Sequence, residues 1–170
     1  MRDQVDILLT VDPGYAGTGV AYFLALGHKF PKAPSTLWTL RSKDKKAHKT
    51  RLDFELVDQF EMLLRRLISG PTRIVIEFPN LWSGSKVSMA SAGSGNLFAL
   101  AALCGAYAAR ANTVFGVEAE FIRPQEWKGQ LPKDVVKRRL IQRWPVLSKT
   151  VSEHALDAAG MGLFLQAGQL

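Results

Sequence analysis

The sequence predicts an α/β fold, a mixed sheet that carries helices on its faces. Two observations lead to this class. Short β-prone runs and longer segments of helical periodicity follow one another in the order β-β-β-α-β-α-β-α-α. The first three β-prone runs have no helix between them, which predicts antiparallel strands, whereas strands that follow a helix are predicted to be parallel. At 170 residues the chain is expected to be one domain, residues 1–170.

The first predicted strand, residues 5–11, is a continuous apolar run typical of the centre of a sheet, and Asp12 stands at its carboxyl end. Pro13-Gly14 and Gly17-Thr18-Gly19 predict a tight turn. After that turn, residues 20–24 are expected to return as an antiparallel strand.

A third strand is predicted at residues 36–40, followed by a basic connection over 41–49 that is either a solvated loop or a DNA contact. Apolar residues at steps of three and four predict an amphipathic helix over residues 51–69. The next buried strand is residues 73–77, and it ends on an acidic residue, Glu77.

The second half of the chain begins with a Ser- and Gly-rich segment, residues 83–95, whose composition is that of a loop. The elements predicted beyond it are an alanine-dense helix over 96–111, a strand over 119–123, a basic helix over 133–143 and a closing helix over 152–165.

The charge and the hydropathy of the chain indicate which kinds of partner it could have. The formal net charge of +7 suits a polyanionic partner, although many basic proteins bind no nucleic acid. No apolar run approaches the length of a membrane span, and the polar N-terminus is unlike a signal peptide, so a cytoplasmic protein without a membrane partner is expected. The lone cysteine, Cys104, lies in an apolar run and is expected to be buried.

Two acidic residues stand at the carboxyl ends of predicted strands, where functional groups gather in open α/β sheets. Asp12 could equally be a turn former. Glu77 follows three β-branched residues and precedes Phe78, so its neighbours predict burial. A buried carboxylate needs a compensating partner, which a metal ion or a salt bridge would supply.

The closing helix adds His154 and Asp157, which lie three residues apart and therefore share one face. Small residues around them would let this helix lie close to the sheet. The spacing of Thr150 and Glu153 predicts a capping box, which makes Glu153 structural.

Carboxylates in such a cluster suit phosphodiester hydrolysis with two divalent ions, because Mg²⁺ prefers hard oxygen ligands. The predicted metal ligands are Asp12, Glu77, His154 and Asp157. Histidine is a poorer Mg²⁺ ligand, so His154 would act as a proton acceptor or as a ligand that also accommodates Mn²⁺.

Three segments together resemble RuvC-type Holliday junction resolvases, most closely those encoded by phages: Val11-Asp12-Pro13-Gly14 with Gly17-Thr18-Gly19, Ile74-Val75-Ile76-Glu77, and the run from His154 to Gly160. They occur in the family's order, and the similarity runs from about residue 5 to 165. The resemblance implies an RNase H-like fold, Mg²⁺ as cofactor, a homodimer, and the cytoplasm of a bacterial host. Asp12, Glu77 and Asp157 match the family's metal-binding acids, and His154 falls where members carry aspartate or histidine.

The resemblance also implies contacts with branched DNA, especially four-way junctions. Lys128 and Lys133 match lysines near the scissile phosphate, where they would take part in catalysis. Phe78, Trp82 and Lys86 are expected DNA contacts, with core packing as the alternative for the aromatic residues.

A dimer would place two active sites for two symmetric cuts. The predicted interface is an apolar stripe on the helix over 96–111, with intramolecular packing as the alternative: Leu97, Leu100, Ala101, Cys104 and Ala108.

Three other functions compete with junction resolution. The glycines after Asp12 also resemble the first phosphate loop of sugar kinases and actin-like ATPases, but those proteins need two such domains. A DNA-binding protein without catalysis would not need the acidic residues. A nuclease of the same fold that acts on RNA–DNA hybrids, forks or flaps stays open.

Overall fold

A mixed sheet forms the centre of the protein. The structure, a computed structural model, describes residues 6–15, 17–25, 29–31, 33–43, 52–79, 95–148 and 151–167. Five described strands lie in the order β3-β2-β1-β4-β5. They are β1 (Ile7–Asp12), β2 (Gly17–Leu24), β3 (Thr36–Arg41), β4 (Thr72–Glu77) and β5 (Ala119–Ile122). The pairs β1–β2 and β2–β3 are antiparallel, and the pairs β1–β4 and β4–β5 are parallel, as the sequence predicts.

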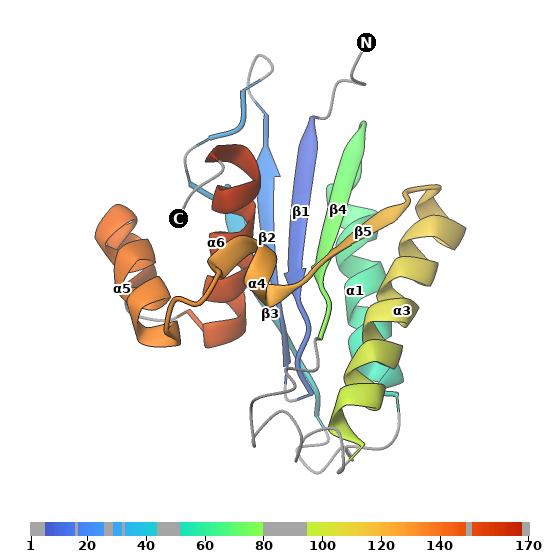
Figure 1. Ribbon diagram of the computed structural model, residues 1–170. Coiled ribbons are helices and arrows are strands. Elements are labelled where there is room, and N and C mark those ends of the chain that lie inside the picture. The colour runs from blue at the N-terminus through green and yellow to red at the C-terminus, as the bar shows by residue number, and fades with distance from the viewer. Residues whose placement is uncertain are drawn as a thin grey trace.

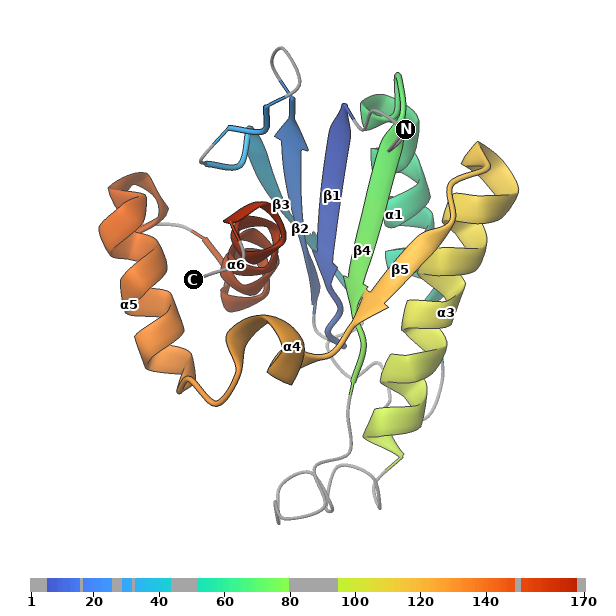
Figure 2. The same cartoon turned by 45° about the horizontal axis from the view of Figure 1, so that its top comes forward.

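Helices cover both faces of this sheet (Figure 1). On one face lie α1 (Phe54–Leu67) and α3 (Asn96–Phe115), and on the other α4 (Pro124–Lys128), α5 (Lys133–Arg143) and α6 (Glu153–Ala167). A short 3₁₀ helix, η1 (Pro145–Ser148), follows α5. Figure 2 shows that α6 lies against the sheet and that α5 lies outside α6. The predicted fold class is confirmed.

The alternation of side chains along each strand divides the interior into two cores. Ile7, Leu9 and Val11 of β1 face α1 and α3, whereas Leu8 faces α6. On the α6 face, the hydroxyl of Thr10 donates a hydrogen bond of 2.6 Å to the carbonyl oxygen of Ala158 within α6. This bond fixes α6 against the centre of the sheet.

One turn prediction was wrong. Gly17-Thr18-Gly19 belongs to β2, which pairs with β1 on one side and with β3 on the other. Gly19 is required by close packing, because a Cβ there would lie 2.1 Å from the backbone carbonyl carbon and oxygen of His154. It lets α6 approach β2, and a turn pattern does not reveal this contact because the two residues are far apart in the sequence.

The helices differ from the prediction at their ends. The helix α1 begins at Phe54 because the side chain of Asp53 caps it, accepting from the backbone N–H groups of Glu55 and Leu56. The helix α3 continues to Phe115 and stops at Gly116, which has a φ of 66°. The short α4 was not predicted as a helix, since its five residues give too little periodicity.

The helix α3 is, among the described helices, the one long and apolar enough to cross a membrane by length and composition. In this fold it packs on the sheet through Leu103, Cys104, Tyr107 and Ala111. The buried thiol of Cys104 agrees with the sequence prediction.

Candidate active site

Asp12 and Glu77 are brought together by the parallel pairing of β1 and β4. The register pairs Val11 with Ile76, so the next residue of each strand, Asp12 and Glu77, lies at the same edge of the sheet. Both side chains belong to the face that α6 covers, because Thr10 and Val75, two residues earlier, also face that side. Their side chains are only 8% and 14% exposed.

His154 and Asp157 approach the same edge from the first turns of α6. The hydroxyl of Ser152 accepts a hydrogen bond from the N–H of Ala155 and so caps α6, whereas the predicted cap, Thr150, lies outside the described residues. Gly14 leaves space for the imidazole, since a Cβ there would lie 2.4 Å from Nε2 of His154.

His154 pairs directly with Asp12. Its Nδ1 lies 2.6 Å from Oδ2 of Asp12, and this hydrogen bond is the main cause that raises the pKa of His154. The contact thus stabilises the imidazolium form of His154 relative to a free histidine. With Nδ1 engaged, Nε2 is the ring nitrogen left for a further partner.

Glu77 has two partners on α4. The indole N–H of Trp127 donates to Oε2 of Glu77 at 2.6 Å, and Nζ of Lys128 lies 3.6 Å from the same oxygen. Burial, together with the negative charge of Asp12, nevertheless raises the pKa of Glu77 to about 7. The surroundings of this carboxyl group therefore disfavour its charged form, mainly because water is excluded from it.

Asp157 shares Lys128 with Glu77. Nζ of Lys128 lies 3.7 Å from Oδ2 of Asp157, so the ammonium group bridges two carboxylates. Burial is the main cause that raises the pKa of Asp157, and the charge of Asp12 raises it further. Lys128 thus neutralises the acidic cluster from within, a different contact from the scissile phosphate that the family resemblance implies for it.

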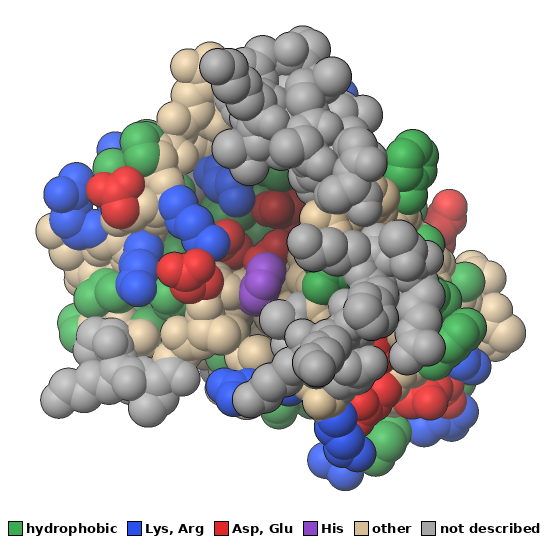
Figure 3. All heavy atoms as spheres, turned by 90° about the horizontal axis from the view of Figure 1, so that it is seen from below, with side chains coloured by type: hydrophobic (Ala, Val, Ile, Leu, Met, Phe, Trp, Pro, Cys, Tyr) green, Lys and Arg blue, Asp and Glu red, His purple; other side chains and the backbone are tan. Residues whose placement is uncertain are grey.

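The rim of the site is basic. Lys133, at the start of α5, places Nζ 2.8 Å from Oε2 of Glu153, at the start of α6. Glu153 is therefore paired with Lys133, and its predicted capping-box partner, Thr150, lies outside the described residues. Figure 3, which views this end of the sheet, shows acidic side chains in a hollow beside a histidine and next to several Lys and Arg side chains.

The predicted DNA contacts beside Glu77 have different outcomes. Phe78 packs edge-to-face on Phe121, with 5.2 Å between ring centroids, and lies against the core under α1 and α3. This is the packing alternative that the sequence left open. Trp82 and Lys86 belong to residues 80–94, which lie outside the described residues.

The four predicted metal ligands are of the right chemical type for a divalent cation, but their side chains are not gathered around one point. Within the described segments, no three His, Cys, Asp or Glu side chains are grouped closely enough to hold a metal ion. Asp12 is turned to His154, and Glu77 and Asp157 are bound to Lys128. Burial, together with the charge of Asp12, raises the pKa of Glu77 and of Asp157, and a cation would stabilise both carboxylates in their charged form; carboxylate oxygens are the donors that Mg²⁺ prefers.

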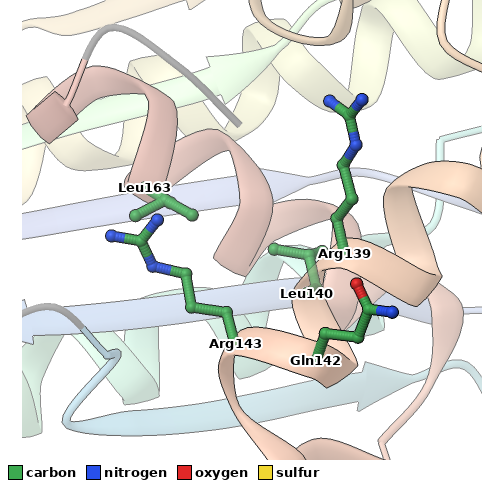
Figure 4. Close-up of a pocket in the computed structure, with 5 residues that line it drawn as sticks. All are labelled: Arg139, Leu140, Gln142, Arg143 and Leu163. Atoms are coloured by element: carbon green, nitrogen blue, oxygen red, sulfur yellow. The ribbon is translucent and has the colours of Figure 1, made fainter.

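A second basic feature lies along α5. A cavity of about 350 Å³ lies between α5 and α6, with the guanidinium groups of Arg139 and Arg143 on either side of Leu140 (Figure 4). Gln142 and Leu163 complete its lining. Neither arginine is paired with a carboxylate of the described residues. The sequence predicts a basic helix here but not the cavity, because Leu163 comes from a distant segment.

Trp127 had no predicted role, and Gly14 and Gly19 were predicted only as turn residues. A signal for Trp127 was present, since it is the single aromatic residue in the polar segment before α5 and precedes Lys128. For the two glycines the turn interpretation was the simpler one, and only the packing of α6 reveals their role.

In sequence, the chain matches no protein-family model and no curated protein. In structure it is similar to RuvC of Thermus thermophilus. The superposition on RuvC in complex with a Holliday junction substrate has a TM-score of 0.60 at 15% identity, and covers 95% of this chain and 96% of that chain. A second structure of the same protein gives a TM-score of 0.58 at 15% identity, covering 96% and 97%.

A weaker match is Ydc2, the yeast mitochondrial Holliday junction resolvase, with a TM-score of 0.48 at 11% identity, covering 94% of this chain and 79% of that chain. The two RuvC structures establish the fold: this chain has the RuvC-like, RNase H-type fold over nearly its whole length.

Proposed function

We propose that this protein is a metal-dependent endonuclease that cleaves branched DNA, with four-way junctions as its main substrate. The observation that carries the proposal is the convergence of Asp12, Glu77 and Asp157, from two parallel strands and a distant helix, at one buried edge of the sheet. The charge of Asp12 contributes to the raised pKa of both Glu77 and Asp157, an arrangement that a purely structural role would not require. The fold shared with RuvC, one of whose structures holds a Holliday junction substrate, supports the choice of substrate.

Asp12, Glu77, His154 and Asp157 would hold Mg²⁺, two ions in each active site, with Mn²⁺ as a substitute. When bound, such ions would supply an activated water and stabilise the charge of the leaving oxygen of the phosphodiester. Lys128 contacts one oxygen of each of Glu77 and Asp157, at 3.6 Å and 3.7 Å. Its ammonium group would therefore lie close enough to the site to meet a phosphate oxygen of bound DNA.

The DNA would lie over the basic rim. Lys133 stands at the start of α5, and Arg139 and Arg143 lie further along the same helix. An α-helix rises about 1.5 Å per residue, so the arginine cavity lies on the order of 10–15 Å from Lys133 along α5. Its two guanidinium groups, neither of them paired with a carboxylate within the described part of the chain, suit a backbone phosphate some nucleotides away from the cleaved bond.

The proposal includes a homodimer, but with a different interface from the predicted stripe. Within that stripe, Cys104 is fully buried and Leu100 and Ala108 pack on the protein's own core. The opposite side of α3 is exposed and apolar, and the four residues that form this outer stripe are Phe98, Ala102, Gly105 and Ala109. Phe98 is 73% exposed, and a second copy of the chain would cover it.

A nuclease assay on four-way, flap and RNA–DNA hybrid substrates, with Mg²⁺ and with EDTA, tests the function. Cleavage of the four-way junction that needs Mg²⁺ is expected. Asp12→Asn, Glu77→Gln and Asp157→Asn should each abolish cleavage and leave junction binding as tight or tighter, because each removes negative charge that faces phosphate.

The outcome of the assay also separates the alternatives. Cleavage of hybrids alone, or of flaps alone, would replace the proposed substrate but keep the metal site. Turnover equal to wild type in any of the three variants would contradict the metal-holding role of that carboxylate.

A further inference from the structure

The short helix α4 contacts the acidic cluster through two consecutive residues. The indole N–H of Trp127 and the ammonium group of Lys128 both approach Oε2 of Glu77, at 2.6 Å and 3.6 Å. Trp127 is only 2% exposed, so its hydrogen bond with the carboxylate is shielded from water. Shielding strengthens a hydrogen bond to a charged group.

Several contacts fix the indole ring. A Cβ on Gly160 of α6 would lie 2.9 Å from Cζ3 of Trp127, so the ring packs directly on the backbone of α6. Nζ of Lys128 lies 4.7 Å from the centroid of the same ring. The ring therefore has little freedom to turn, and its N–H direction is set by the packing of α4 on α6 and not by Glu77.

We propose that Trp127 is a positioning residue that fixes the orientation of the Glu77 carboxylate. An ammonium on a flexible stem attracts a carboxylate without setting its direction, so Lys128 cannot do this by itself. A rigid indole N–H holds Oε2 in one place and so determines where Oε1 and the remaining lone pairs point. The inference rests on the proposed function, because the fixed orientation serves the metal-holding role of Glu77.

The test removes the indole N–H of Trp127 and keeps an aromatic ring in its place. Trp127→Phe retains an aromatic ring but has no donor, and Trp144→Phe is the matched control, since Trp144 is buried in the same core and forms no hydrogen bond with an acid of the site. Binding of Mn²⁺ to the DNA-free protein is measured by calorimetry, and cleavage of the junction is measured in single turnovers.

Trp127→Phe should weaken Mn²⁺ binding by about 10- to 100-fold and slow cleavage by a similar factor, the range typical for partners that orient a metal ligand. Its affinity for the junction in EDTA should be unchanged, because Trp127 is buried and does not face DNA. Trp144→Phe should change none of these quantities.

A variant with benzothienylalanine at position 127 guards against a folding defect in Trp127→Phe. Its sulfur replaces the indole N–H while the shape of the ring system is kept, so the same loss of Mn²⁺ affinity is expected. Mn²⁺ affinity and cleavage like wild type in this variant would overturn the inference. Such a result, with cleavage still lost in Glu77→Gln, would leave the proposed function intact, whereas cleavage retained in Glu77→Gln would overturn both.

Discussion

Glu77 has an acid–base property that can be measured in the metal-free protein. Its pKa rises to about 7 in the folded state, mainly through burial, from an ordinary value of 4.5. Between these two pH values the folded protein binds more protons at this group than the unfolded chain does. The free energy of unfolding therefore falls as the pH rises through this window, and the loss is complete above about pH 7.

Glu77→Gln should remove this pH dependence. In EDTA, the free energy of unfolding of the variant minus that of the wild type should increase as the pH rises from 4.5 to 8. A pKa that rises from 4.5 to about 7 sets an upper bound of about 3 kcal/mol on this gain. Urea titrations at several pH values measure it. A difference between the two proteins that stays constant with pH would contradict the buried, repelled state of the carboxyl group.

His154 offers a second test at the residue scale. Its Nδ1 is hydrogen-bonded to Asp12, so His154→Asp replaces an attractive contact with two like charges. We expect this variant to be less stable without metal, to gain more in melting temperature from Mg²⁺ than the wild type does, and to retain cleavage. His154→Ala should cleave slowly but measurably. Complete loss of cleavage in the aspartate variant would contradict the interchange of aspartate and histidine that the RuvC resemblance implies.

At the scale of elements, the site depends on how closely α6 lies against β1 and β2. Thr10 bonds to a carbonyl oxygen within α6, and Gly19 touches the backbone of His154. Gly162 makes similar room for the ring of Phe23. These contacts bring His154 and Asp157 to the sheet edge, so the spacing between α6 and the sheet controls the geometry of the acidic cluster.

Gly19→Ala tests this spacing. The new methyl group meets backbone atoms, which cannot move aside as a flexible side chain could, so α6 must shift. We expect a loss of about 1–3 kcal/mol in the free energy of unfolding, the usual cost of overpacking, together with a strong loss of cleavage. Gly70→Ala is the control, because a Cβ there meets only one side-chain atom at 3.8 Å, and its effect should stay within about 0.5 kcal/mol. Equal effects of the two changes would contradict the close approach of α6.

At the scale of the whole molecule, the charge distribution sets the expected DNA surface. The acidic cluster lies at one end of the sheet, and the Lys and Arg side chains beside it extend along α5 (Figure 3). The charge of +7 over the full chain is thus partly concentrated on the side of the proposed active site. Binding should be salt-dependent for this reason.

Replacing Arg139 and Arg143 together by alanine should reduce the slope of log K against log salt concentration by about 2, since each phosphate contact contributes about 0.9. Cleavage at saturating enzyme should be unchanged, because neither residue touches the acidic cluster. Fluorescence anisotropy with a labelled junction measures the slope. The matched control replaces Arg65 and Arg66 of α1, on the other face of the sheet, and an equal change in that control would contradict a specific phosphate site in the cavity.

The oligomeric state is the second prediction at this scale. Sedimentation at micromolar concentration should give about twice the chain mass of 18.8 kDa. Gly105→Arg, in the outer stripe of α3, should give a folded monomer that nicks junctions without resolving them. Met62→Arg, on an exposed site of α1, should remain a dimer. A wild-type protein that stays monomeric with and without DNA would favour a flap or hybrid nuclease.

Local sequence patterns were enough to predict the order of the main elements, the mixed sheet and the residues of the acidic cluster. Continuous apolar runs and helical periodicity are local properties, so β1, β4 and α1 could be predicted within a few residues. Asp12 and Glu77 were predictable because parallel strands bring their carboxyl ends to one edge.

The side-chain partners of the acidic residues, in contrast, follow from the tertiary packing. The bridge of Lys128 between two acids, the bond from Trp127 to Glu77 and the glycines that admit α6 all join segments far apart in the chain. The same holds for α3, whose predicted stripe packs inward through Leu100, Cys104 and Ala108 while the other side of the helix is exposed. Such contacts depend on the distance between packed elements, which no local pattern encodes. A glycine or an alanine gives the same sequence signal in a turn, in a core and in an interface.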